Sequence, residues 1–286
     1  MTRLPLVAAA VASLAAVLPA TASAAVQTET ATATSPAGEV RAEFSYDKRG
    51  DFEYRDVRIK ITRAGAVLHD ALVPAPCDEC SAAPQGIGDA ENPSVQARDL
   101  DADGEPEVLV DLYTGGAHCC SFTQIYRHDA ATNTYRRTKG SWYDYGYELV
   151  DLDKDGSPEF RSADFRFAAA FTAYAASGAP PRILKFAGGR LADVTRSYRS
   201  IVKQNLKEYL SLYKKYRKDR ELNDVRGFLA AYTADKYLLG QRKTAFDLVY
   251  AAYRRGELRA QFGDTSASGK RYISALRKFL RKAGYR

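Results

Sequence analysis

The chain has 286 residues, of which 45% are hydrophobic and 27% are charged, and its formal net charge is +7. This length is sufficient for one large domain or two smaller ones. The balance of apolar and charged residues excludes a wholly disordered chain and a collagen-like one. We therefore expect a folded protein with a substantial hydrophobic core.

The first segment of the chain has the features of an export signal. The longest apolar run, residues 4–25, follows the cation Arg3 and ends in the sequence Ala-Ser-Ala at 22–24. A basic start, an apolar run and an A-x-A site are typical of a secretory signal peptide. The run is short and is interrupted by Pro19, which argues against an uncleaved membrane anchor. We expect residues 1–24 to be cleaved and the protein to be secreted or associated with the cell envelope.

The four cysteines of the chain are Cys77, Cys80, Cys119 and Cys120. Because disulfides persist in oxidising compartments, an exported protein is expected to oxidise them. The favoured arrangement is two bridges that tie the 77/80 loop to the 119/120 pair, each stabilising the fold by ~2–4 kcal/mol. A vicinal bond between Cys119 and Cys120, and a zinc site that includes His118, are the alternatives.

Hydrophobic patterning divides the rest of the chain into a β part and a helical part. Residues 25–38 are rich in Thr, Ala and Ser without apolar periodicity, which predicts a flexible linker. Residues 39–194 alternate apolar and polar side chains in short runs separated by turn signals, which predicts antiparallel strands. These strands are expected at residues 40–46, 57–62, 107–113, 122–126, 135–137, 147–150, 160–167, 171–175 and 183–186.

Residues 195–286 change to a helical period and are expected to form a basic helical domain. The first helix is expected around residues 201–213, where apolar side chains share one stripe. The following three are expected from Asn223 to Leu239, from about Lys243 to Arg255, and from behind Ser268 to near Gly284.

Charge separates the two parts. Residues 26–195 hold 18 Lys and Arg against 27 Asp and Glu, a net charge of −9, whereas residues 196–286 hold 23 against 8, a net charge of +15. The protein is therefore electrically bipolar, and the two parts could complement one another internally.

A duplicated acidic segment is the strongest signal in the sequence. Its copies read D-L-D-A-D-G-E-P-E from residue 99 and D-L-D-K-D-G-S-P-E from residue 151, and each precedes a predicted strand. Carboxylates at positions 1, 3 and 5 can converge on one cation, Gly at position 6 permits a sharp turn, and the carboxylate at position 9 closes the shell. Oxygen ligands at this density favour calcium over magnesium. An acidic turn without metal is the alternative, although so many carboxylates without a cation would repel one another.

This loop resembles the calcium loops of FG-GAP/VCBS-type repeats, which form the β-propeller blades of integrin-like and many secreted bacterial proteins. The resemblance covers roughly residues 95–195, and Glu replaces the commoner Asp at position 9. It implies two calcium ions whose ligands are Asp99, Asp101, Asp103, Glu107, Asp151, Asp153, Asp155 and Glu159. A closed propeller needs ~4–8 blades, more than this chain can supply. The predicted fold is therefore mainly β, with antiparallel blade-like sheets in a partial propeller or sandwich, followed by an α-helical C-terminal domain.

Two groups of side chains are candidates for ligand binding. Trp142, Tyr143 and Tyr145 could form a platform on which sugar rings stack, or they could be ordinary sheet aromatics. A basic group could bind anionic wall polymers, acidic lipid head groups or, least expected, nucleic acid. Its members are Lys214, Lys215, Arg217, Arg277 and Lys278. Solvated helix faces that dock on the acidic part of the chain are the alternative.

No convincing catalytic constellation is present in the sequence, because His118 stands beside cysteines that are expected to be oxidised. The predicted function is a secreted, calcium-stabilised binding module for an extracellular or envelope glycan, anionic polymer or protein. The alternative is a secreted hydrolase acting on a polysaccharide or a phosphorylated polymer, with Asp144 or Glu148 as the acting carboxylate.

Overall fold

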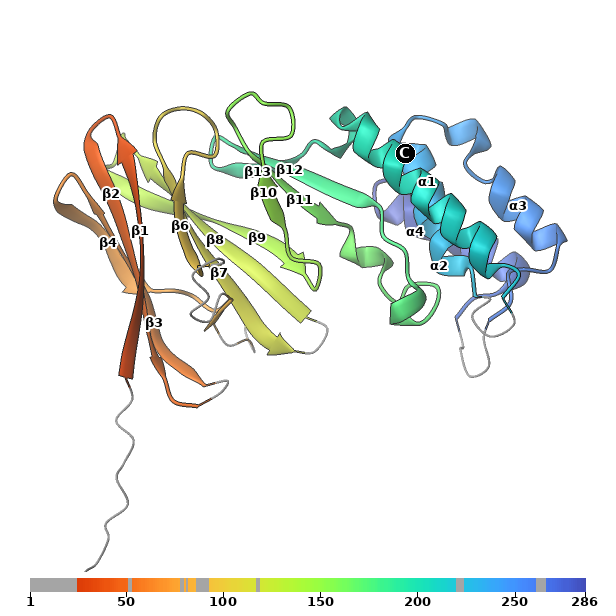
Figure 1. Ribbon diagram of the computed structural model, residues 1–286, viewed down its shortest axis with the longest axis horizontal. Coiled ribbons are helices and arrows are strands. Elements are labelled where there is room, and N and C mark those ends of the chain that lie inside the picture. The colour runs from red at the N-terminus through yellow and green to blue at the C-terminus, as the bar shows by residue number, and fades with distance from the viewer. Residues whose placement is uncertain are drawn as a thin grey trace, which may run out of the picture.

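The computed structural model describes residues 25–50, 53–77, 80, 82–85, 93–116, 119–219, 224–260 and 266–286. The predicted signal peptide and His118 lie outside these ranges. Three antiparallel sheets stand side by side in chain order, and the helices follow beyond the third sheet (Figure 1). The predicted fold class, mainly β followed by a helical C-terminal part, is confirmed, and the sheets do not close into a barrel.

The first sheet has the strand order β1 (Ala25–Ser35), β2 (Gly38–Lys48), β3 (Tyr54–Arg63) and β4 (Ala66–Leu72). Strand β1 pairs with β2 along its whole length, from Ala25 opposite Lys48 to Ser35 opposite Gly38. The predicted flexible linker over residues 25–38 is therefore wrong. Its many Thr residues are β-branched and suit an edge strand, and pairing with β2 orders a segment that has no apolar stripe of its own.

The second and third sheets contain the remaining strands. The second consists of β5 (Ala83–Pro84), β6 (Val95–Arg98), β7 (Glu107–Gly116), β8 (Cys119–Asp129) and β9 (Thr134–Tyr143). The third consists of β10 (Glu148–Val150), β11 (Glu159–Ala163), β12 (Pro181–Ala187) and β13 (Arg190–Asp193). The strand predicted over 160–167 ends at Ala163, and the 3₁₀ turn η1 (Phe165–Phe167) follows it. The strand predicted over 171–175 is absent, and the 3₁₀ turn η2 (Tyr174–Ala176) begins in this segment instead.

Four α-helices follow, as the sequence predicts. They are α1 (Arg199–Tyr216), α2 (Arg226–Leu238), α3 (Asp247–Arg254) and α4 (Gly269–Lys282), with the 3₁₀ turns η3 (Thr195–Ser197) before α1 and η4 (Arg242–Thr244) before α3. Gly240 and Gly256 end α2 and α3 with positive φ, as expected for helix stops. The proposed cap Asn223 lies outside the described residues. None of the described helices combines the length and apolar character needed to cross a membrane.

Three apolar cores hold these layers together. Strand β7 is buried on both faces: Val108 and Val110 pack toward the first sheet, whereas Leu109 packs toward the third. The third core lies among the helices, and it includes Phe167 and Phe171 from the segment between β11 and β12. Because these two rings leave the sheet to pack among the helices, their segment does not form the predicted strand.

No salt bridge joins the acidic part to the basic part in the described ranges of the chain. Among the described residues, every salt bridge joins two residues on the same side of residue 195. The predicted docking of basic helix faces onto the acidic part is therefore not seen, and the two parts meet through the shared apolar core instead.

Candidate metal centre

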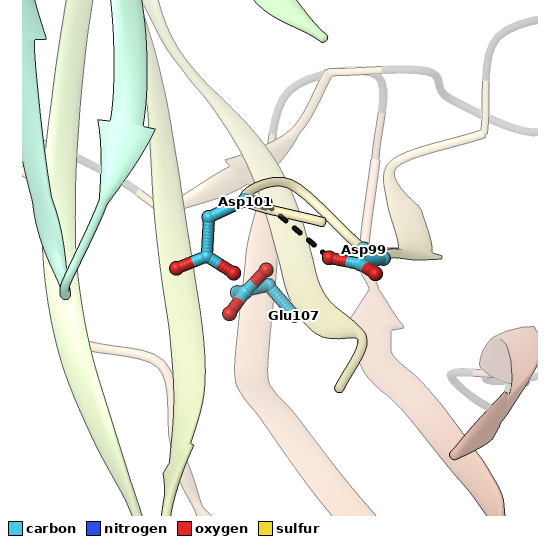
Figure 2. Close-up of side chains that lie close together, drawn as sticks. All are labelled: Asp99, Asp101 and Glu107. Carbon is cyan, nitrogen blue, oxygen red and sulfur yellow. Dashed lines mark hydrogen bonds between the residues drawn. The ribbon is translucent and has the colours of Figure 1, made fainter. Parts of the chain in front are cut away.

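The two acidic segments form loops of the same shape, one ending at the start of β7 and the other at the start of β11. In each loop, one carboxylate oxygen from each of three residues lies within 4.8 Å of the other two. The clusters are Asp99, Asp101 and Glu107 in the first loop, and Asp151, Asp153 and Glu159 in the second. Figure 2 shows the first cluster, in which the carboxylates of Asp101 and Glu107 face one another. The structure thus brings together three of the four predicted ligands in each loop.

Backbone hydrogen bonds hold the first loop in this shape. The amide of Gly104 donates to Asp99 Oδ2 at 2.8 Å, and the amide of Leu100 donates to Glu107 Oε2 at 3.0 Å. Gly104 has φ +85°, in the left-handed region that glycine adopts without strain. The local sequence therefore turns the chain so sharply that the carboxylate of the ninth residue, Glu107, approaches that of the first, Asp99.

The second loop repeats each of these contacts. The amide of Gly156 donates to Asp151 Oδ2 at 2.9 Å, the amide of Leu152 donates to Glu159 Oε2 at 3.0 Å, and Gly156 has φ +90°. Two segments that are 52 residues apart thus share one hydrogen-bond pattern as well as one sequence pattern.

Each cluster contains buried carboxylate oxygens that accept no hydrogen bond within the described residues. These atoms are Glu107 Oε1, Glu159 Oε1 and Asp101 Oδ1, and both glutamates are fully buried. Burial raises the pKa of Glu107 to about 8, and burial together with the nearby Asp103 raises the pKa of Asp101. A cation among these oxygens would supply the missing partner, because calcium bonds of 2.3–2.6 Å place ligand oxygens up to about 5 Å apart.

A basic side chain stands beside each cluster. In the first loop, Arg127 of β8 lies 2.8 Å from Asp103 and 3.6 Å from Glu107 Oε1. In the second loop, Lys185 of β12 lies 2.5 Å from Asp155 and 3.4 Å from Glu159 Oε1. One basic side chain thus stands beside the four predicted ligands of each loop, so it offsets only part of their negative charge.

The fifth position of each loop departs from the prediction. Asp103 accepts a hydrogen bond from the amide of Glu105 at 2.8 Å and pairs with Arg127, and Asp155 accepts one from Ser157 at 2.9 Å and pairs with Lys185. Neither residue belongs to the three-carboxylate cluster of its loop. The two aspartates hold the neighbouring basic side chains.

The two loops also contact one another, which their separation in sequence does not reveal. The hydroxyl of Ser157 donates to the carbonyl of Leu100 at 3.1 Å, and this contact is buried. Further contacts join the loops to other elements: Glu105 pairs with Arg63 of β3, and Tyr198, which precedes α1, donates to Asp153 at 3.2 Å. The pair of loops therefore connects all three sheets and the first helix.

The cysteines pair differently from the prediction. Cys77 is bonded to Cys80, with their Cα atoms 5.1 Å apart, so the expected bridges from the 77/80 loop to the 119/120 pair are wrong. Cys120 is also in a disulfide, whereas the side chain of Cys119 lies outside the described part. A spacing of three residues within one turn brings two cysteines together more readily than a contact between distant segments.

The three aromatic residues of the predicted platform do not share one surface in the structure. Trp142 is 1% exposed, its indole stacks on Phe160 at 5.0 Å, and its Nε1 donates to Thr123 at 2.8 Å. Trp142 is therefore an ordinary sheet aromatic, the alternative to the platform, because its inward position on β9 places it between two sheets. Tyr143 and Tyr145 are exposed and flank the ring of Phe165.

The carboxylates of the alternative hydrolase each have a partner. Asp144 accepts a hydrogen bond from the hydroxyl of Tyr174, and Glu148 pairs with Arg161 on the neighbouring strand. Glu148 is exposed. These contacts hold the two groups in surface pairs rather than aiming them into a common cavity.

The predicted basic residues fall into two separate groups. Lys214, Lys215 and Arg217 lie at the end of α1, where Arg217 pairs with Glu257 at 2.8 Å. Arg277 and Lys278 lie on α4 and line a cavity that also contains basic residues from η4 and the chain end.

One family model matches the helical part of the chain. Residues 202–284 match the family described as the sll0997 C-terminal domain. This range runs from the first turn of α1 to the glycine that follows α4, and it does not include the acidic loops. No solved structure matches the chain.

Two relatives cover more of the chain. It is 31% identical over 214 residues to a Synechocystis protein named "Probable thylakoid lumen protein sll0997", a match that covers 67% of this chain and 60% of the relative. It is 30% identical over 221 residues to "Uncharacterized protein y4bJ" of Sinorhizobium fredii, covering 77% of this chain and 33% of that protein. The chain therefore spans less than two thirds of the length of either relative.

Proposed function

We propose that the protein is an extracytoplasmic binding protein whose β part is stabilised by two calcium ions, one in each acidic loop. The observation that carries this proposal is the repeated geometry. Both loops place three carboxylates around one point, and both bury a glutamate oxygen, Glu107 Oε1 or Glu159 Oε1, that accepts no hydrogen bond within the described residues.

The chemistry of the donors favours calcium. All the convergent groups are carboxylate oxygens, which suit a hard cation, and the flexible mixture of loop and strand ligands suits calcium better than the strict octahedron of magnesium. Arg127 and Lys185 neutralise only part of the charge of their loops. A divalent cation would remove much of the remaining repulsion.

The contacts of the loops suggest what calcium would stabilise. Ser157 joins the two loops to one another, Arg63 joins them to β3, and Tyr198 joins them to the start of α1. An ordered pair of loops would therefore fix the positions of the sheets relative to the first helix. We therefore assign the loops a structural role, with ligand binding carried by other surfaces.

The extracytoplasmic location has independent support. The first 24 residues have the pattern of an export signal. The described part holds a Cys77–Cys80 disulfide, as is usual in oxidising compartments. A relative of 31% identity is named "Probable thylakoid lumen protein sll0997", and the thylakoid lumen is separated from the cytoplasm by a membrane.

The test is a thermal melt of the oxidised protein in millimolar calcium and in excess chelator. With a dissociation constant of ~10⁻⁴ M, each site adds about 1–2 kcal/mol, and two sites raise the melting temperature by roughly 5 °C or more. The double variant Asp101→Asn/Asp153→Asn should lose this response, because each substitution removes a cluster carboxylate. Its matched control is Asp70→Asn/Asp129→Asn, which changes two carboxylates outside the clusters and should keep the response. A wild-type melt that ignores calcium would refute the proposal.

A further inference from the structure

A basic groove lies between the end of α2, the turn η4 and the second half of α4. It is a cavity of about 560 Å³, and we call it the α4 groove. Its lining includes the five cations Arg242, Arg277, Lys278, Arg281 and Arg286, and no acidic residue lines it. Three of these five, Arg277, Lys278 and Arg281, come from α4, whereas Arg242 comes from η4 and Arg286 from the chain end.

The cations of the α4 groove lack carboxylate partners in the part of the chain that the structure describes. Within the described residues, none of the five takes part in a salt bridge. The contrast with Arg217 and Arg255 is direct, because both of these pair with Glu257 at 2.8 Å. Five neighbouring positive charges repel one another, and an anionic ligand would relieve this repulsion.

One of these cations is held in place by aromatic residues. The Arg277 guanidinium lies 4.5 Å from the centroid of the Phe246 ring, and it donates to the hydroxyl of Tyr250 at 2.6 Å. A cation held by an aromatic face and a phenol needs no carboxylate, so its remaining donors stay available at fixed positions.

A second cavity of about 370 Å³ shares Tyr285 with the α4 groove. Its charged lining consists of the three arginines Arg166, Arg182 and Arg196 and the two aspartates Asp164 and Asp193. Because the aspartates offset most of the arginine charge, the excess of positive charge is concentrated in the α4 groove.

The shape and the side-chain types indicate the class of ligand. Four of the five cations are arginines, whose planar donors bind phosphate oxygens in pairs, and Arg277 and Arg281 are one helical turn apart on the same face. The cations line a hollow together with Tyr237 and Tyr285, whereas a membrane-binding helix presents its apolar side chains on one continuous face. A narrow polymer fits a hollow better than a flat bilayer does.

We propose that the α4 groove binds a linear polymer whose repeating units carry phosphodiester groups. This inference rests on the proposed function only in treating the protein as a binding module, since the calcium loops belong to other elements. It names a ligand class and a site, and both are testable without knowing the natural polymer.

The probe is a short, fluorescently labelled abasic oligodeoxynucleotide, which carries phosphodiesters and no bases. Its binding to the full-length protein is followed by fluorescence anisotropy at low salt. The variant Lys278→Gln/Arg281→Gln should weaken binding roughly tenfold or more and reduce the dependence of binding on salt, because fewer counterions are released.

The matched control is Lys48→Gln/Arg98→Gln, which removes the same charge from β2 and β6. These strands belong to the first and second sheets, whereas the groove lies among the helices beyond the third sheet (Figure 1). The control should bind as the wild type does. Equal losses in both variants would overturn the assignment of the groove, because they would reflect net charge alone.

Two further binding measurements test the class of ligand. Polygalacturonate carries carboxylates in place of phosphates, and if it bound as tightly as the probe, the phosphodiester assignment would be wrong. Vesicles of anionic phospholipid that bound while the probe did not would also overturn the proposal. Thermal melts of each variant in calcium and in chelator check folding, and they report on the calcium loops separately from the groove.

Discussion

The phenolic oxygen of Tyr147 lies 3.0 Å from both carboxylate oxygens of Asp111. Thr123 of β8 also donates to this carboxylate, and the indole nitrogen of Trp142 on β9 donates to Thr123 at 2.8 Å. A carboxyl group on the central strand β7 is thus held by donors from neighbouring strands and from the segment that begins the third sheet. These contacts tie the second sheet to the third through a polar network in an otherwise apolar layer.

Burial of Asp111 should make the stability of the protein depend on pH. Desolvation raises the pKa of Asp111 from its ordinary value of 3.8 to about 6, although the hydrogen bonds lower it. The folded state therefore binds the proton more tightly than the unfolded state between pH 4 and 6. The stability that protonation provides is full below pH 4 and is lost as the pH rises through 6, by about 3 kcal/mol in total.

This change is measured by urea unfolding of the wild type and Asp111→Asn from pH 4 to 7 in chelator. The free-energy difference between the two proteins should shift by about 3 kcal/mol over this range in favour of the variant. Tyr147→Phe keeps the carboxyl and removes one of its donors, so its pH dependence should be at least as steep as that of the wild type. A constant difference between wild type and Asp111→Asn would show that Asp111 does not titrate in this window.

Arg127 should compete with calcium in the first loop. Its guanidinium lies 2.8 Å from Asp103 and 3.6 Å from Glu107 Oε1, so it offsets part of the negative charge when calcium is absent. Arg127→Gln should lower the melting temperature in chelator and enlarge the increase that calcium produces. The control Arg136→Gln removes an exposed partner of Asp129 and should leave the calcium response unchanged. If Arg127→Gln responded to calcium as the wild type does, the expected competition between Arg127 and calcium would be contradicted.

The buried pair of Asp224 and Arg226 should be sensitive to loss of its carboxylate. Both side chains are at most 1% exposed, and Thr172 donates to Asp224 at 2.8 Å. Asp224→Asn leaves the guanidinium charge buried without this counter-charge and should cost about 3–5 kcal/mol in urea unfolding. Asp70→Asn, which breaks the exposed pair with Arg58, should cost no more than about 1 kcal/mol. Similar losses in the two variants would contradict the argument from burial.

Gly227 in α2 should not tolerate a side chain. A Cβ at this position would lie 2.8 Å from Thr172 Cγ2 and closer still to the carbonyl oxygen of Ala176. Alanine is favoured over glycine in helices by about 1 kcal/mol, yet Gly227→Ala should destabilise the protein by more than this preference because backbone must move. Gly50→Ala, where nothing lies within 4 Å, is the control and should be close to neutral. A stabilised Gly227→Ala variant would mean that the two segments are not packed closely.

Features that depend on neighbours in the chain were predictable from the sequence. The helices α1 to α4 follow their apolar stripes, and Gly240 and Gly256 end two of them as expected. The acidic loops were predictable for the same reason, because alternate carboxylates before a glycine converge through a single local turn. The ninth residue of each loop is also the first residue of the strand that follows. The sequence therefore also indicated that a glutamate would complete each cluster.

Features that depend on distant partners were not predictable in this way. Strand β1 has no apolar stripe, and its order comes from pairing with β2. Trp142 could equally have faced solvent, because alternation along β9 does not reveal that a third sheet covers one face. The prediction that Cys77 and Cys80 form disulfides with the 119/120 pair was wrong, because the fold places these two cysteines beside one another and they bond to each other.

The sequence by itself determined the class of fold, the two acidic loops and the separation of charge. Each of these depends only on the order and spacing of residues that are near one another in the chain. Only the tertiary structure decided that the loops contact one another through Ser157 and that Arg242 and Arg286 join Arg277 in one groove. The physical reason is that local turns and helices are set by short-range sterics and hydrogen bonds. Which loops and cations meet depends instead on how the apolar cores pack distant segments together.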